Sequence, residues 1–186
     1  GDPCDFTNLM GAVIDRSAFN SIKSYIDYAN ESEEAEVLTG HYDDSKGYFI
    51  YPTIIETTNP RFKTMREEIF GPVLTIYVYE DSEIDSAVKH CKEDTVYALT
   101  GSIFAQSREA IISLEKEFSY TAGNFYINDK PTGSAVGLQP FGGSKLSGTN
   151  DKTGTVMNLY RWTSARTIKE NFVPTDDVNY ISMQER

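Results

Sequence analysis

The stretch from residue 73 to residue 128 decides the fold: VLTIYVYEDSEIDSAVKHCKEDTVYALTGSIFAQSREAIISLEKEFSYTAGNFYIN. Runs at 73–79, 99–105 and 124–128 are rich in β-branched and aromatic residues, which is typical of strands. The first run is apolar throughout, as expected of a strand that is buried on both faces. Two segments with helical spacing separate the runs. Strand, helix, strand, helix and strand in this order predict two crossover units, and therefore an α/β fold with a parallel sheet and flanking helices.

Both helices of this stretch are preceded by side chains that can cap them. Asp81 or Ser82 is expected to cap the first helix, and Ser107 the second. Apolar residues repeat at three- and four-residue spacing, which marks the inner face. The expected inner residues are Ile84, Ala87, Val88 and Cys91 in the first helix, and Ile111, Leu114 and Phe118 in the second.

A further helix and a hairpin are predicted before this stretch. Residues 17–29 form the helix, with Ser17 as its expected cap. A turn at 43–47 separates two strand-like runs, the second at 48–55. The apolar face of the helix is expected to consist of Phe19, Ile22, Ile26 and Ala29.

After residue 128 the sequence has few helix or strand signals. Residues 129–148 hold five glycines and two prolines, and a loop of this length is usually functional or disordered. Leu138 and Phe141 within it argue against disorder. Residues 159–169 alternate enough to predict a strand, and a polar tail follows Phe172.

Composition excludes several classes of protein. With 28 acidic against 17 basic residues, the net charge of −11 argues against a nucleic-acid or anionic-membrane surface. No run approaches the roughly 18 apolar residues that span a bilayer. Two cysteines cannot form a disulfide framework, which favours a reducing compartment. Because Met10 is the first methionine, we expect the chain to start inside a longer protein.

Three motifs resemble the aldehyde dehydrogenase superfamily in order and spacing: EEIFGPV at 67–73, GNFYIND at 123–129 and PFGGSKLSG at 140–148. The resemblance implies that residues 1–158 are the C-terminal part of a catalytic domain. It further implies that residues 159–172 are a strand arm that pairs across the subunit interface of a homo-oligomer, expected to be a homodimer. Residues 173–186 would be a tail.

NDKPTGSAVGLQPFGG at 128–143 and SGTNDK at 147–152 are similar to one branch of this family. That branch oxidises L-glutamate 5-semialdehyde, formed from 1-pyrroline-5-carboxylate, to L-glutamate with NAD in proline catabolism. The resemblance implies a mitochondrial matrix location in a eukaryote and a cytoplasmic one in a bacterium. Two alternatives stay open: another semialdehyde-specific dehydrogenase, or a non-catalytic assembly module of this fold.

The resemblance implies that Glu68 and Phe70 bind the cofactor. A glutamate at this place accepts hydrogen bonds from the nicotinamide ribose hydroxyls, and the phenylalanine packs beside the ribose and ring. The plainer alternative is a surface pair of glutamates before a strand, with Phe70 as a core residue.

The resemblance also implies that Gly133 and Ser134 bind the substrate's α-carboxylate, and that Phe141 forms one wall of the pocket for its aliphatic stem. A hydroxyl and backbone N–H groups in a tight glycine loop can form a small anion nest. The alternatives are an ordinary turn at Gly133 and Ser134, and an anchoring role for Phe141.

No catalytic residue is expected within the chain. The resemblance implies that the nucleophile is a cysteine in a run upstream of the matched segment, whereas Cys4 lies in a different sequence context, beside the acidic Asp2 and Asp5. Cys91 is expected to be buried and inert.

His41 and His90 have no spaced partners, so no metal site is predicted. The glycine cluster fits neither a P-loop nor a GxGxxG fingerprint. We therefore expect the chain to be inactive alone.

Overall fold

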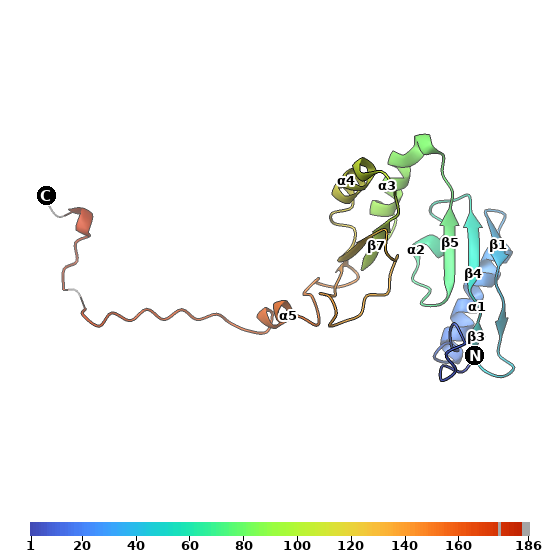
Figure 1. Ribbon diagram of the computed structural model, residues 1–186, viewed down its shortest axis with the longest axis horizontal. Helices are drawn as coiled ribbons and strands as arrows, with labels where there is room; N and C mark the ends of the chain where they lie inside the picture. Colours follow the sequence, from blue (N-terminus) through green and yellow to red (C-terminus); the bar gives the residue numbers. More distant parts are fainter. Residues whose placement is uncertain (175, 184–186) are drawn as a thin grey trace.

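A computed structural model describes residues 1–174 and 176–183 of the chain. The chain forms two compact parts, followed by a long extended tail (Figure 1). The first part contains α1 (Arg16–Asn30), β1 (Ala35–Thr39), β2 (Tyr42–Asp43), β3 (Phe49–Ile50), β4 (Thr53–Thr57), α2 (Lys63–Arg66) and β5 (Val73–Tyr77). The second contains η1 (Asp81–Glu83), α3 (Ile84–Glu93), β6 (Tyr97–Ala98), β7 (Thr100–Ile103), α4 (Arg108–Glu117), β8 (Asn124–Ile127) and β9 (Ser144–Lys145). The tail includes α5 (Val156–Tyr160) and η2 (Ile181–Met183).

Helix α1 is capped by Asp15 and not, as the sequence predicted, by Ser17. The backbone of Asp15 is extended, which lets its carboxylate accept a hydrogen bond of 2.7 Å from the N–H of Ala18. Ser17 lies inside the first turn. The predicted apolar face is confirmed, because all four of its residues are buried: Phe19, Ile22, Ile26 and Ala29.

This apolar face packs on a three-stranded sheet. β1 runs antiparallel to β4, and β4 runs parallel to β5, with Thr53 opposite Val73 and Thr57 opposite Tyr77. The predicted turn is confirmed, since β2 pairs with β3 on either side of it, but the strand predicted at 48–55 is divided between β3 and β4. The core of the first part consists of two clusters: Phe19, Ile22, Ile26 and Ile50, and Ala29, Ile55 and Phe62.

In the second part, α4 connects the parallel strands β7 and β8, which confirms one predicted crossover unit. Ser107 caps α4 as predicted, accepting a hydrogen bond of 3.2 Å from the N–H of Ala110. Neither Asp81 nor Ser82 caps α3, because both belong to the short 3-10 helix that precedes it. Val88 is the buried residue of α3.

The α/β class is confirmed, but the parallel strands do not form one sheet. β4–β5 and β7–β8 are separate parallel pairs, and β5 is the edge of its sheet. β5 is also shorter than predicted, and Leu74 on it is exposed, so within the described residues this strand is not buried on both faces. Among the described residues no further strand lies beside β5. This accounts both for the separation of the two parallel pairs and for the exposure of Leu74.

Side chains of Arg61 and Arg66 join the two parts through Asp94, at the end of α3. Arg61 Nε donates to both carboxylate oxygens at 3.0 and 3.1 Å, and Arg66 Nε donates to the backbone carbonyl at 3.3 Å. Burial opposes ionisation of Asp94, but hydrogen bonds from His90 and Arg61 outweigh it and hold the pKa of this carboxyl below its usual value.

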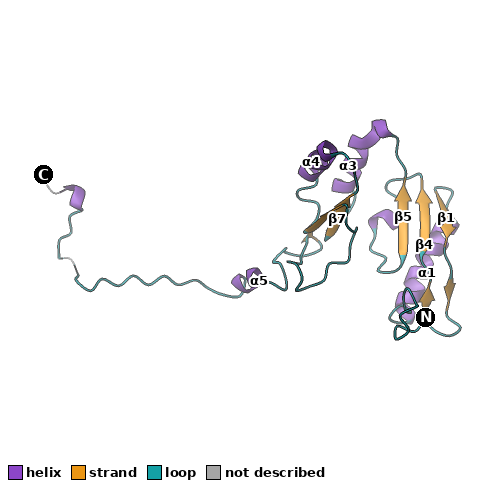
Figure 2. Cartoon of the chain, in the orientation of Figure 1, coloured by secondary structure: helices purple, strands orange, loops and turns teal. Residues whose placement is uncertain are grey.

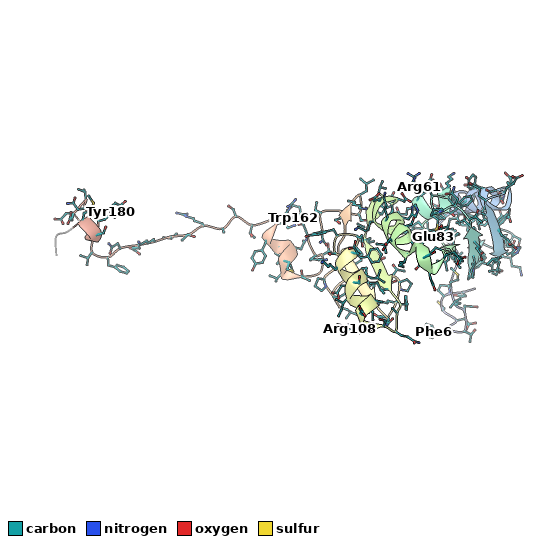
Figure 3. All side chains as sticks on the ribbon, turned by 90° about the horizontal axis from the view of Figure 1, so that it is seen from above. Phe6, Arg61, Glu83, Arg108, Trp162 and Tyr180 are labelled. Carbon is teal, nitrogen blue, oxygen red and sulfur yellow. The ribbon has the colours of Figure 1, made fainter. Side chains whose placement is uncertain are left out.

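The strand predicted at 159–169 does not form. Leu159 and Tyr160 belong to α5, and the chain beyond them is extended without a paired strand among the described residues (Figure 2). A strand needs a neighbour for its backbone hydrogen bonds, and no other described segment lies there. In Figure 3, Trp162 marks where the tail leaves the body, and Tyr180 lies far from it. Residues 175 and 184–186 of the predicted tail lie outside the described residues.

The described helices include none long and apolar enough to cross a membrane.

Replacing the observed cap should destabilise the chain more than replacing the predicted one. We expect Asp15→Ala to lower the free energy of unfolding by about 1 kcal/mol, because the N–H of Ala18 loses its acceptor. Ser17→Ala is the matched control, and it should change stability little because its hydroxyl caps nothing. Urea unfolding of both variants checks this, and equal losses would contradict the assignment of Asp15 as the cap.

Candidate functional site

In the loop before β5, the aromatic side chain of Phe70 is exposed to solvent. Ile69 packs against the first core cluster, and a side chain on Gly71 would come within 2.6 Å of Ile22 Cδ1. Between these two fixed residues, Phe70 has a φ of 55° and its side chain is 89% exposed. A non-glycine residue in this region of φ is uncommon and often marks a functional site. Phe70 is therefore not a core residue, and its ring is free to meet a ligand.

The two glutamates of this loop differ in their contacts. Glu67 accepts a hydrogen bond of 2.7 Å from the hydroxyl of Tyr25 on α1. Glu68 is exposed and has neither a hydrogen bond nor an ion pair with another described residue. The carboxylate of Glu67 thus supports the fold, whereas that of Glu68 remains available to a ligand with hydroxyl donors.

The loop after β8 is fixed where it returns to that strand. A side chain on Gly123 would come within 1.8 Å of the carbonyl oxygen of Gly142, so only glycine fits. The buried amide of Asn124 donates to the carbonyl of Pro140 at 2.8 Å and accepts from the N–H of Gly142 at 3.2 Å. Both neighbours of Phe141 are therefore held against the start of β8. The ring of Phe141 is half-buried, so the structure supports an anchoring role as well as a wall.

Further along this loop, Ser134 belongs to a cluster of three hydrogen-bonded side chains. Its hydroxyl is hydrogen-bonded to that of Tyr126, which lies on β8, and it accepts from Gln139 Nε2 at 3.1 Å. Gln139 Nε2 also donates to the Tyr126 hydroxyl at 2.6 Å. The cluster fixes the position of the Ser134 hydroxyl relative to the strand.

Gly133 and Lys130 give this loop the properties of an anion site. Gly133 has a φ of +90°, which favours glycine, and open space lies where a side chain would begin. Lys130 Nζ donates to the carbonyl of Gly133 at 3.1 Å and lies 5.5 Å from the ring centre of Tyr126. An ammonium group bound to the backbone of an open glycine, with a serine next in the chain, favours the approach of a carboxylate.

The five predicted site residues thus fall into two loops. Gly133, Ser134 and Phe141 share the loop after β8, whereas Glu68 and Phe70 lie in the loop before β5. No hydrogen bond or ring contact between described residues joins the two groups. Sequence reasoning gave no role to the residues that hold the second loop: Asn124, Tyr126, Lys130 and Gln139. The first two stand inside the GNFYIND motif, which marks a strand but not its side-chain bonds.

The two cysteines do not belong to these loops. Cys91 is exposed, so the prediction that it is buried is wrong; Val88 occupies the buried position of α3 instead. Protein atoms around the thiol still desolvate it and raise the pKa of Cys91, which keeps it largely protonated. Cys4 is exposed in the N-terminal turn, where its N–H donates to Asp2 at 2.8 Å. The described residues contain no cluster of His, Cys, Asp and Glu that could hold a metal ion.

Cys91 lines a cleft of about 530 Å³ between the two parts. None of the five predicted site residues lines this cleft. Its wall is formed by residues of β5, α3, β7, α4 and β8 or next to them, including Tyr77, Cys91, Leu99, Phe118 and Phe125. The cleft therefore separates the edge of one sheet from the other parallel pair.

Residues 1–168 match the aldehyde dehydrogenase family, and the chain belongs to that family. It is 56% identical over 181 residues to the mitochondrial delta-1-pyrroline-5-carboxylate dehydrogenase of Dictyostelium discoideum, covering 97% of this chain and 32% of the relative. It is 46% identical over 186 residues to the mitochondrial human enzyme of the same name, covering 99% and 33%. The chain spans about a third of the length of these relatives.

The solved structures agree. The delta-pyrroline-5-carboxylate dehydrogenase of Mycobacterium tuberculosis bound with NAD matches with a TM-score of 0.82 and 43% identity. The match covers 99% of this chain and 33% of that one. The likeness therefore extends over the chain, including both candidate loops.

Removing the Asn124 amide should loosen the second loop locally. We expect Asn124→Ala to speed hydrogen exchange of the Gly142 N–H about fivefold, because that group loses an acceptor worth about 1 kcal/mol. Asn128→Ala is the matched control, since its amide bonds the backbone of Ala105 at 2.8 and 2.9 Å and not the loop. Faster exchange of Gly142 in both variants would contradict a specific role for Asn124.

Proposed function

We propose that this chain is the C-terminal part of an NAD-dependent dehydrogenase that oxidises L-glutamate 5-semialdehyde to L-glutamate. The observation that carries the proposal is the anion site of the second loop, where the Lys130 ammonium bonds the carbonyl of the open Gly133 and the Ser134 hydroxyl follows next in the chain. The substrate has an α-carboxylate that such a site would bind. The names of the similar proteins support the same substrate class.

Glu68 and Phe70 are the residues we assign to NAD. The Glu68 carboxylate is free of contacts within the described chain, so it can accept hydrogen bonds from the two ribose hydroxyls. Phe70 presents an exposed ring beside it, which can pack against ribose and nicotinamide. When bound, NAD supplies the acceptor for the hydride of the aldehyde. The chain's own residues hold the end of the cofactor that must meet the substrate. The M. tuberculosis structure bound with NAD supports NAD as the cofactor.

Phe141 is the residue we assign to the aliphatic stem of the substrate. The Asn124 amide bonds the backbone of the residues on either side of it, so the backbone that carries its ring is held in place. Burial of a short stem contributes only a few kcal/mol at about 25 cal/mol per Å². Orientation of the aldehyde is therefore the larger effect of this wall.

The chain is proposed to need the rest of the enzyme for activity. The family works through a cysteine, and neither Cys4 nor Cys91 is placed in the two loops. The separate strand pairs and the cleft between them favour docking against further protein. The extended tail carries exposed apolar side chains, including Trp162 and Phe172, which supports pairing with a second subunit in a homo-oligomer. In a eukaryotic source we propose a mitochondrial location, as in the names of the eukaryotic relatives, and in a bacterial source a cytoplasmic one.

Glu68→Gln in the full-length enzyme should slow hydride transfer more than it weakens NAD binding. Because the ribose contact positions the ring, its loss should lower kcat, roughly tenfold for a charged hydrogen bond. Glu67→Gln is the matched control, since the amide can still accept from Tyr25, and kcat should stay close to that of the parent enzyme. A higher NAD dissociation constant with unchanged kcat would show that Glu68 contributes only affinity.

Ser134→Ala in the full-length enzyme tests the substrate assignment. A hydrogen bond to a charged oxygen contributes about 1.5–3 kcal/mol, so kcat/KM for glutamate semialdehyde should fall roughly ten- to hundredfold. An aliphatic aldehyde of similar length has no carboxylate to lose, and its kcat/KM should change little. Equal losses for both substrates would mean that Ser134 only shapes the loop, and the substrate proposal would fail.

A further inference from the structure

We propose that Tyr126 and Gln139 are positioning residues that direct the Ser134 hydroxyl proton toward the substrate's carboxylate. The inference rests on the proposed function of Ser134 and concerns residues to which the sequence motifs gave no role. It follows from the donors and acceptors within the three-residue cluster.

The hydroxyl proton of Tyr126 has one possible acceptor within the cluster. Tyr126 is buried, with 8% of its surface exposed, and a buried hydroxyl proton needs an acceptor. Its oxygen has two partners among the described residues, Gln139 Nε2 and Ser134 Oγ. The amide nitrogen is a donor only. With the amide nitrogen of Gln139 facing both hydroxyls, Tyr126 donates to Ser134 Oγ.

The direction of the Ser134 hydroxyl follows from this. Ser134 Oγ accepts from Tyr126 and from Gln139, so both of its described partners are donors. A serine hydroxyl has one proton, and neither partner can receive it. The proton therefore points away from the cluster. Because Ser134 is only half-buried and Gly133 beside it is open, the proton is available to an anion in that space.

The orientation of the Gln139 amide determines which group donates in each hydrogen bond of the cluster. If its oxygen faced the two hydroxyls instead, Tyr126 would donate to it and Ser134 would donate to Tyr126. The serine would then present only lone pairs to the substrate, which would repel a carboxylate. The selectivity for substrates with a carboxylate therefore depends on a neutral side chain that does not touch the substrate.

The test uses the full-length enzyme and two aldehydes, glutamate semialdehyde and an aliphatic aldehyde of similar length. The readout is the ratio of their kcat/KM values. Gln139→Met keeps the length of the side chain and removes the donor, and we expect the ratio to fall about fivefold. Gln139→Glu places acceptors where donors stood, so the ratio should fall at least as far as in Ser134→Ala. Gln106→Met is the control for a distant exposed glutamine and should leave the ratio unchanged.

Double variants separate positioning from a merely structural role. In the Ser134→Ala background, neither Gln139→Met nor Tyr126→Phe should lower the ratio further, because the proton that they direct is gone. Additive losses, or equal losses for both aldehydes in Gln139→Met, would overturn the inference. If Ser134→Ala itself leaves the ratio unchanged, the substrate proposal fails instead, so the two failures are distinguishable.

Discussion

The contact between Gly123 and Gly142 is the constraint on which the second candidate loop depends. No side chain fits on Gly123, because its first atom would lie 1.8 Å from the Gly142 carbonyl oxygen. This approach brings Asn124 within reach of the backbone on both sides of Phe141. Strand β8 therefore carries the loop at its first residues. It also carries Tyr126, which bonds Ser134, so one short strand positions both the wall and the anion site.

The described strands do not form one continuous sheet. Each parallel pair has an edge without a partner among the described residues, and an apolar-walled cleft lies between the pairs. Strand edges with free N–H and C=O groups invite further pairing. The two candidate loops, one from each part, can act together only when their relative position is held, and Asp94 with its two arginines is the described link between the parts.

The local sequence pattern predicted helices and strands of this chain. Features that depend on contacts between distant residues could not be predicted from it. Periodicity predicted the buried face of α1, and a serine before an apolar repeat predicted the cap of α4. The predicted cap of α1, Ser17, is wrong. The extended backbone of Asp15 lets that residue cap the helix instead. At 159–169 no paired strand is present among the described residues, and the predicted pairing of this segment across a subunit interface stays a prediction, because a strand needs a second strand for its backbone hydrogen bonds. The bonds of Gln139 could not be predicted either, since its partners stand 5 and 13 residues away with no repeating pattern.

In both candidate loops the fold holds the neighbours of an aromatic residue, Phe70 in the first loop and Phe141 in the second. Ile69 and Gly71 pack against the first core, and Phe70 between them is forced outward at a φ of 55°. Pro140 and Gly142 are bonded to Asn124, and Phe141 lies between them. Fixing the flanks restricts the backbone without using the side chain that would meet a ligand, so the contact surface is ordered before binding. Substitution of the exposed Phe70 should then alter ligand contacts at little cost to the fold, whereas substitutions of its flanking residues would disturb both.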